Sequence, residues 1–177
     1  MKTLIIGLVF SALASVPLFA ALKVADTAPD FAARASLAGK EFNFSLQDAL
    51  KKGPVVVYFY PSAYTKGCDL EAHTFATEKD KFDAAGATII GVSADSIARL
   101  DVFSADPDYC AGKFPVASDE TKDISKSFDA IMQTRPDYAN RISYVIAPNG
   151  AVVSYYQSLN PFKHVERMLA AVKEIKK

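Results

Sequence analysis

The chain has 177 residues, of which 50% are hydrophobic, so it is long enough for one domain with a full core and too short for two. Its 20 basic and 20 acidic side chains cancel at pH 7. They are interspersed, and the one basic cluster, the C-terminal KEIKK, is typical of a solvated helix end. This pattern argues against nucleic acid or an anionic membrane surface as a partner.

The N-terminal segment differs in composition from the rest of the chain. Lys2 precedes an apolar run at 4–16, which is followed by Pro17 and small residues. This is the layout of a secretory signal peptide, and the run is shorter than the roughly 20 residues of a membrane-spanning helix, so an uncleaved anchor is the less favoured alternative. We predict a signal peptide at 1–20 and an exported, periplasmic domain at 21–177 with no stable membrane association after cleavage.

Hydrophobic periodicity divides the mature chain into alternating strands and helices. The first half predicts a hairpin at 35–46 around Gly39 and Lys40, a short helix at 45–52, a strand at 54–60, and a helix from Thr65 to the stop at Gly86. The second half predicts a strand at 87–94, a helix at 97–109 interrupted by Pro107, a short edge strand at 113–119, a helix at 121–131, a hairpin at 142–157, and a helix at 161–177.

Three of these segments carry the strongest signals. Residues 54–60 (PVVVYFY) are apolar on both faces, which indicates a strand buried between two layers. Asn149 and Gly150 are typical of a hairpin turn with positive φ, and Pro161 fits the first position of a helix. The order of elements predicts an α/β fold with a mixed central β-sheet flanked by helices on both faces.

Cys68, one of two cysteines, follows the stretch PSAYTKG. If the helix begins at Thr65, Cys68 lies in its first turn, where free N–H groups and the helix dipole favour an anion. A free thiol has a pKa near 8.5, and a useful nucleophile needs a value roughly two lower, whereas a helix end stabilises an anion by only ~0.3 to 1 kcal/mol. A reactive cysteine here therefore also needs a cation.

Two of the five arginines are candidates for that cation. Arg141 stands immediately before the predicted strand ISYVIA, so a rigid element would hold it, and Arg135 lies in a loop. Two other interpretations of Cys68 remain open at this point. It could be a small buried hydrophobe, or it could form a disulfide with Cys110, because exported proteins with an even number of cysteines usually pair them.

The motif around Cys68 resembles that of the peroxiredoxins, the AhpC/TSA superfamily. Pro61, Thr65 and Cys68 match the pattern of Pro, three residues, Thr or Ser, two residues, Cys. The following DLEAHTF resembles the helix of the peroxiredoxin Q, or bacterioferritin-comigratory-protein, subgroup. The segments VADTAPDF, GVSADS and RISYVIAPNGAVV resemble further parts of the family in the same order, so the resemblance covers nearly all of the mature chain.

The resemblance implies a thioredoxin-like fold and a thiol-dependent peroxidase for hydrogen peroxide and organic hydroperoxides. It implies no cofactor or metal, a thioredoxin-like dithiol as reductant, and a monomer or weak homodimer. Carried over by position, Cys68 is the peroxidatic cysteine, Thr65 the hydroxyl that binds peroxide, Pro61 the shield of the thiolate, and Arg141 the group that polarises both thiolate and peroxide. The backbone N–H groups of Gly67 and Cys68 would be further donors.

The chain departs from the subgroup at two positions. Many members carry the resolving cysteine five residues after the peroxidatic one, where this chain has His73, and a proline is common where it has Lys66. Other members place the resolving cysteine on the helix after the second core strand, and Cys110 lies at the end of that region. Cys110 is therefore the candidate resolving residue, as an intramolecular disulfide with Cys68.

Three alternative functions stay open. A one-cysteine peroxidase would use Cys68 with an external thiol. A thiol-disulfide oxidoreductase is less favoured, because Glu71 stands where a Cys-x-x-Cys pair has its second cysteine. The third alternative is an exported, non-enzymatic domain of the same fold with a structural disulfide.

Overall fold

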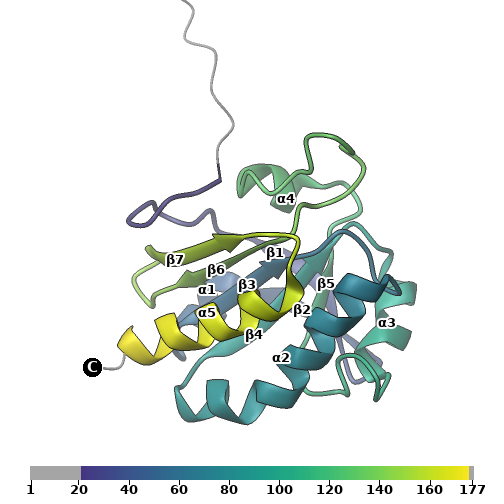
Figure 1. The fold of residues 1–177 in the computed structure, drawn as a ribbon, viewed down its shortest axis with the longest axis horizontal. Coiled ribbons are helices and arrows are strands. Elements are labelled where there is room, and N and C mark those ends of the chain that lie inside the picture. The colour runs from purple at the N-terminus through teal and green to yellow at the C-terminus, as the bar shows by residue number, and fades with distance from the viewer. Residues whose placement is uncertain (1–20, 176–177) are drawn as a thin grey trace, which may run out of the picture.

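The computed structural model describes residues 21–175 of the chain, so the predicted signal peptide at 1–20 lies outside the described residues. One seven-stranded sheet has the order β2-β1-β5-β4-β3-β6-β7 and carries helices on both faces (Figure 1). The strands are β1 Ala32–Leu37, β2 Lys40–Ser45, β3 Val55–Phe59, β4 Thr88–Ser93, β5 Val116–Ser118, β6 Ile142–Ile146 and β7 Val152–Gln157. The helices are α1 Leu46–Leu50, α2 Lys66–Ala84, α3 Ile97–Ala105, α4 Asp123–Ser127 and α5 Pro161–Ile175. The predicted fold class is confirmed.

The central strand β3 is buried along its whole length. Its side chains alternate, so that Val56 and Tyr58 join a core cluster with residues of α2, α3 and α5. Val55, Val57 and Phe59 join the cluster on the opposite face, which includes residues of α1. β3 pairs in parallel with β4 and antiparallel with β6, so its carboxyl end, where Pro61 follows, lies at the centre of the sheet.

β5 corrects the prediction of an edge strand. It pairs in parallel with β4 and antiparallel with β1, and the β1–β2 hairpin forms the true edge. A three-residue strand preceded by a proline looks like an edge in the sequence. Pairing with residues some 80 positions earlier in the chain, at Ala35 and Ser36, leaves no local signal.

The two predicted hairpins form, with turns that differ in detail. The first turns at Ala38 and Gly39, with φ of 51° and 75°, one residue earlier than expected. In the second, Gly150 has a φ of 84°, and its N–H donates to the Ala147 carbonyl at 2.8 Å, while Asn149 is not left-handed.

Two predicted helices are shorter in the structure than in the sequence pattern. α3 ends at Ala105, two residues before Pro107, because the residue before a proline disfavours helical angles. α4 spans only Asp123–Ser127 of the predicted 121–131.

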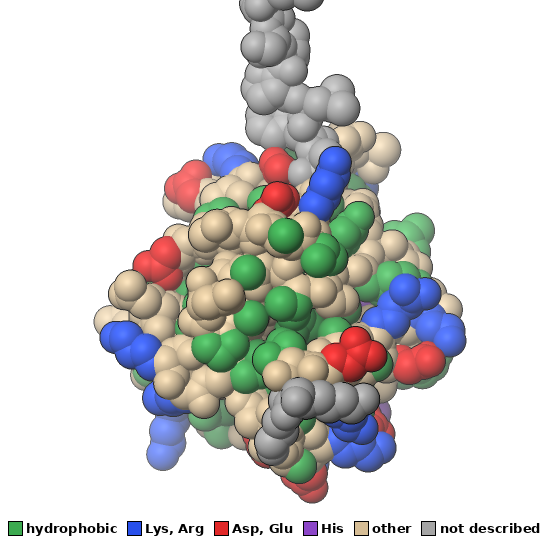
Figure 2. Space-filling view, turned by 90° about the vertical axis from the view of Figure 1, so that its left-hand side faces the viewer, with side chains coloured by type: hydrophobic (Ala, Val, Ile, Leu, Met, Phe, Trp, Pro, Cys, Tyr) green, Lys and Arg blue, Asp and Glu red, His purple; other side chains and the backbone are tan. Residues whose placement is uncertain are grey.

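The surface of the described part shows no dominant charge. On the face in Figure 2, basic and acidic side chains are interspersed around a central group of hydrophobic ones. None of the helices within residues 21–175 is both long enough and apolar enough to cross a membrane.

Candidate active site

Cys68 is the third residue of α2, and Thr65 is the N-cap, as predicted. The thiol is 1% exposed and lies in the core cluster on the α2 face of the sheet. The Cys68 N–H donates to the Thr65 carbonyl at 2.8 Å, so one of the two backbone donors expected for a substrate already has an acceptor. The sulfur sits at the positive end of a 19-residue helix, where a thiolate is favoured.

Arg141 supplies the cation that the helix end requires. It directly precedes β6, whose first residue Ile142 pairs with Phe59 at the carboxyl end of β3. Its Nη2 lies 3.2 Å from the Cys68 sulfur, and its Nη1 donates to the Gly67 carbonyl at 3.3 Å. The guanidinium is 5% exposed, so solvent screens this contact little.

Gly67 makes room for the guanidinium. A Cβ at this position would lie 3.0 Å from Nη2 of Arg141, closer than side chains normally pack. The absence of a side chain at Gly67 therefore permits the approach of Arg141 to the sulfur.

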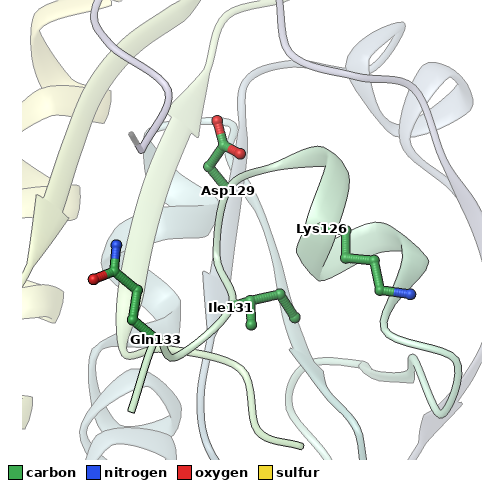
Figure 3. Close-up of a pocket in the computed structure, with 4 residues that line it drawn as sticks. All are labelled: Lys126, Asp129, Ile131 and Gln133. Atoms are coloured by element: carbon green, nitrogen blue, oxygen red, sulfur yellow. The ribbon is translucent and has the colours of Figure 1, made fainter. Parts of the chain in front are cut away.

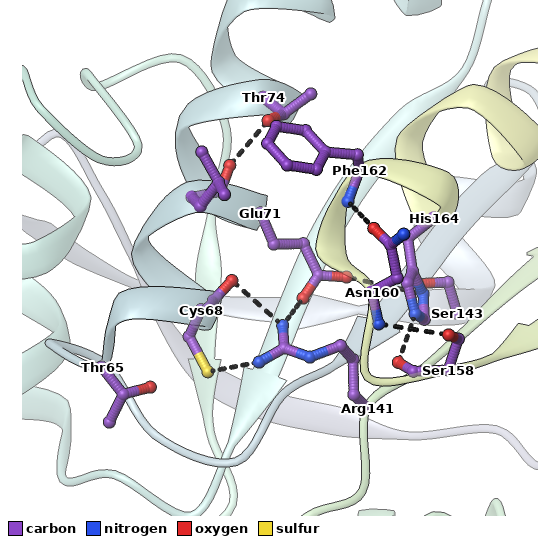
Figure 4. A network of polar contacts seen from close by, with 12 residues as sticks. Thr65, Cys68, Glu71, Thr74, Arg141, Ser143, Ser158, Asn160, Phe162 and His164 are labelled. Carbon is purple, nitrogen blue, oxygen red and sulfur yellow. Dashed lines mark hydrogen bonds and ion pairs between the residues drawn. The ribbon is translucent and has the colours of Figure 1, made fainter.

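Nη1 of Arg141 also donates to Oε2 of the Glu71 carboxyl group, one helical turn after Cys68 (Figure 4). Glu71 is fully buried, and its second oxygen, Oε1, lies 3.5 Å from Nδ1 of His164 in α5. His164 is also fully buried, with Nδ1 2.8 Å from the Ser143 hydroxyl and Nε2 2.9 Å from the Ser158 carbonyl. A buried polar network thus links Cys68 to α5.

Burial shifts both titratable members of this network toward their neutral forms. Desolvation raises the pKa of Glu71 to about 8, although the attraction of Arg141 acts in the opposite direction. Desolvation also lowers the pKa of His164 to about 4, against the hydrogen bond to Ser158, which favours the charged ring.

The loop between β3 and α2 is held by Asp95 and Arg99. The carboxylate of Asp95 accepts hydrogen bonds from the Ser62 hydroxyl at 2.9 Å and the Ala63 N–H at 2.7 Å. Arg99 pairs with Asp95 at 3.2 Å and donates to the Ala63 carbonyl at 2.8 Å. The hydroxyl of Thr65 donates to the Ser62 carbonyl at 2.9 Å, which leaves its lone pairs available as acceptors.

The sequence analysis assigned no role to Asp95, although a signal was present. Asp95 follows the carboxyl end of β4, and β4 is the parallel neighbour of β3, with Val92 paired to Phe59. The carboxyl ends of neighbouring parallel strands meet at one edge of a sheet, so a carboxylate in GVSADS belongs beside the loop that follows β3.

Cys110 lies in the turn segment after α3 and is fully buried. Both cysteines are free thiols. Burial raises the pKa of the Cys110 thiol far above its ordinary range, and the charges of Asp106 and Asp69 add to this effect. In the reduced protein, therefore, Cys110 is a neutral thiol.

Two contacts connect the segment around Cys110 with the segment around Cys68. The ring of Tyr64 packs edge-on against that of Tyr109, with centroids 5.5 Å apart. The Nδ1 of His73 lies 3.1 Å from the Asp108 carbonyl. His73 is thus an exposed helix residue that also contacts the Cys110 segment.

Arg135, the alternative cation, lies elsewhere. Its side chain is exposed and stacks on the Tyr138 ring at 4.3 Å, in the loop before β6. A pocket of about 320 Å³ next to this loop is lined by Lys126, Asp129, Ile131 and Gln133 (Figure 3), none of which is a predicted site residue.

The sequence comparisons agree with the geometry of the site. Residues 24–155 match the AhpC/TSA family. Peroxiredoxin Bcp from Xanthomonas campestris pv. campestris is 33% identical over 125 residues, which cover 67% of this chain and 76% of that protein. The chloroplastic peroxiredoxin Q of Sedum lineare is 32% identical over 127 residues, which cover 71% of this chain and 67% of that protein.

The fold comparison gives the same result. The crystal structure of peroxidoxin BcpB from Mycobacterium tuberculosis superposes with a TM-score of 0.77 at 25% identity, covering 88% of this chain and 99% of that one. This chain therefore belongs to the AhpC/TSA family of peroxiredoxins, and it is a thiol-dependent peroxidase.

Proposed function

We propose that the chain reduces hydrogen peroxide and organic hydroperoxides through a sulfenic acid on Cys68. The thiolate attacks one peroxide oxygen, an S–O bond forms, and the O–O bond breaks. The electron pair leaves on the second oxygen, which takes up a proton and departs as water or an alcohol. The observation that carries this proposal is the 3.2 Å separation between Nη2 of Arg141 and the Cys68 sulfur.

Three residues would assist Cys68 in this step. Arg141 stabilises the thiolate and the charge that develops on the departing oxygen. The Thr65 hydroxyl accepts a hydrogen bond from the peroxide, which orients the O–O bond for attack. Pro61, at the carboxyl end of β3, limits access of water to the sulfur.

In the second step, we propose that Cys110 condenses with the sulfenic acid. Its thiolate attacks the Cys68 sulfur, an S–S bond forms and the S–O bond breaks. The departing hydroxide takes up the proton that Cys110 lost on ionising and leaves as water. An external thioredoxin-like dithiol then reduces the disulfide to two thiols. The packing of Tyr64 on Tyr109, next to Cys110, supports this pairing of segments.

Resolution requires local unfolding. Disulfide formation needs Cα atoms about 6 Å apart with free access to both sulfurs, whereas both thiols are buried here. The first turn of α2 and the segment after α3 would both have to open, and exposure to solvent would also allow Cys110 to ionise.

The test is a stopped-flow titration of the fully reduced protein with peroxide, followed by intact-mass analysis. We expect one equivalent to be consumed rapidly and two hydrogens to be lost as the disulfide forms. Cys68→Ser should consume no peroxide rapidly. If the reduced wild-type protein also consumes none, the proposed role of Cys68 fails.

The burial of Cys110 favours one alternative, in which an external thiol reduces the sulfenic acid directly. Cys110→Ser separates the two cycles. If Cys110 resolves, this variant forms no intramolecular disulfide and loses turnover with a thioredoxin-type reductant. Unchanged turnover would support the one-cysteine cycle instead.

We also propose that the protein is exported and that residues 1–20 are removed. The apolar run behind Lys2 supports this assignment. The test is cell fractionation with mass analysis of the mature N-terminus. An intact Met1 in the cytoplasmic fraction would contradict it.

A further inference from the structure

The Oε1 atom of Glu71 is a buried carboxyl oxygen without a hydrogen-bond donor in the described part of the chain. It lies 3.5 Å from Nδ1 of His164. The other oxygen, Oε2, pairs with Arg141. An ionised carboxylate in this place would leave half of its charge facing a histidine ring in the protein interior.

The surroundings of His164 fix which ring nitrogen carries the proton. Nε2 faces the Ser158 carbonyl at 2.9 Å, and a carbonyl only accepts, so Nε2 donates. In a neutral ring, Nδ1 then has one lone pair, to which the Ser143 hydroxyl can donate at 2.8 Å, and Oε1 of Glu71 faces the same atom at the longer distance of 3.5 Å. A lone pair opposite a carboxylate oxygen is repulsive unless a proton lies between them.

The ring itself is in a poor place for a positive charge. His164 lies in the first turn of α5, where the helix dipole disfavours cations, and it is fully buried. The Tyr156 ring packs against it in a T-shaped arrangement, with centroids 4.8 Å apart. A low pKa of about 4, caused by this burial, agrees with a neutral ring.

We infer that Glu71 is protonated on Oε1 in the folded protein and that His164, as the acceptor, holds this proton in place. The inference rests on the proposed role of Cys68 in one respect. A neutral Glu71 does not compete for the charge of Arg141, so the guanidinium can compensate the Cys68 thiolate. His164 would then be a positioning residue that acts on the reacting sulfur through Glu71 and Arg141.

The other charged and titratable groups around Glu71 and His164 are consistent with one buried proton on this pair. An ionised Glu71 and an ionised Cys68 would place two negative charges on one guanidinium that is itself buried. A raised pKa of about 8 for Glu71, caused by burial, is consistent with the protonated form. Among residues 21–175, the titratable or charged side chains that face the pair are Arg141, Cys68, Tyr58 and Tyr156, and Arg167 of α5 lies over the Tyr156 ring.

Spectroscopy on the unaltered, reduced protein tests the proton directly. At pH 7, ¹⁵N NMR should show His164 as a neutral ring protonated on Nε2. Infrared spectroscopy should show the carbonyl band of a protonated carboxylic acid, and Glu71→Gln should remove it. An imidazolium pattern for His164, or the absence of that band, would overturn the inference whether or not the protein reduces peroxide.

The link to Cys68 is tested by alkylation with iodoacetamide, which reads the thiolate rather than peroxidase turnover. In His164→Gln, the amide N–H can donate to Glu71, which stabilises the carboxylate and draws the charge of Arg141 away from the sulfur. We expect alkylation at pH 7 to slow about tenfold. In a Glu71→Gln background, His164→Gln should cause no further change.

His73→Gln is the matched control, because His73 is an exposed histidine on α2 that does not contact Glu71. It should leave the alkylation rate unchanged. If His164→Gln slows alkylation equally in the wild type and in Glu71→Gln, His164 acts by packing alone, and the link to Cys68 is overturned. If His164→Gln slows alkylation in the wild type but not in Glu71→Gln, and the protein consumes no peroxide, only the proposed function is rejected.

Discussion

The Nη2 atom of Arg141 lies 3.2 Å from the sulfur of Cys68, although 73 residues separate them in the chain. The contact is made because β6 lies next to β3 in the centre of the sheet, so the residue before β6 meets the helix that follows β3. The site therefore depends on a long-range strand pairing that a stable fold keeps rigid.

Replacing Arg141 by lysine keeps a positive charge but removes the fork that reaches Cys68 and Glu71 at once. We expect the second-order rate constant for peroxide to fall at least about 100-fold, as for the loss of a charge-stabilising donor. Stopped-flow kinetics measure this. Arg135→Lys, an exposed site away from the sulfur, serves as the control and should match the wild-type rate. An unchanged rate in Arg141→Lys would remove Arg141 from the mechanism.

Gly67→Ala separates reactivity from stability. Alanine is the better helix former by about 1 kcal/mol, so the thermal midpoint should not fall. The new Cβ would lie 3.0 Å from Nη2 of Arg141 and displace the guanidinium, so alkylation of Cys68 should slow severalfold. Differential scanning calorimetry and iodoacetamide kinetics measure the two effects. Unchanged alkylation would mean that the guanidinium shifts without consequence for the sulfur.

Stability should fall as the pH rises from 6.5 to 8. The pKa of Glu71 is about 8 in the folded protein, against an ordinary value of 4.5 in the unfolded chain. Between these two values the folded state binds one more proton than the unfolded state. The free energy of unfolding therefore falls as the pH rises through this range. His164 has a pKa of about 4 when folded, against an ordinary 6.5, and acts in the opposite sense below pH 6.5. The effect of Glu71 is therefore unopposed only above pH 6.5.

Urea denaturation measures this slope. We expect the free energy of unfolding to drop by about 2 kcal/mol between pH 6.5 and 8, and the drop to disappear in Glu71→Gln. Glu166→Gln is the matched control, because Glu166 is an exposed glutamate paired with Lys163. If the slope persists in Glu71→Gln, it arises elsewhere in the protein.

His73→Ala should accelerate resolution without changing the first step. The ring contacts the Asp108 carbonyl at 3.1 Å, and loss of one hydrogen bond worth about 1 kcal/mol would let the Cys110 segment open about fivefold more often. Quenched-flow mass analysis of disulfide formation measures this, with Thr77→Ala, one turn further along α2, as control. Slower disulfide formation would mean that His73 guides the closing of the disulfide rather than restraining it.

Local sequence was sufficient for the centre of the site. The apolar run of β3, the proline that follows it, and the helix pattern after Thr65 placed Cys68 in a helix first turn. Because the energy of a helix end alone was too small, a cation was expected, and position made Arg141 and Arg135 the candidates. The family resemblance then selected Arg141. Each of these features is encoded by a few neighbouring residues, although Arg141 lies 73 residues from Cys68 in the chain.

The outer part of the site was not predictable in the same way. The contact between Glu71 and His164 depends on how α2 packs against α5, which no local pattern specifies. Apolar helix faces predict burial, but a buried histidine on such a face gives no indication of its partner. The interior position of β5 was missed for the same reason, since its partner β1 comes from the start of the domain.

The packing of Tyr64 against Tyr109 gives this protein an optical signal of its own cycle. The chain has eight tyrosines and no tryptophan, so no indole emission covers that of the tyrosines. Tyr64 precedes the first turn of α2 and Tyr109 is adjacent to Cys110, so opening of either segment separates the two rings. In the proposed cycle, intrinsic tyrosine fluorescence should therefore follow the reduced and oxidised forms in real time without an added label.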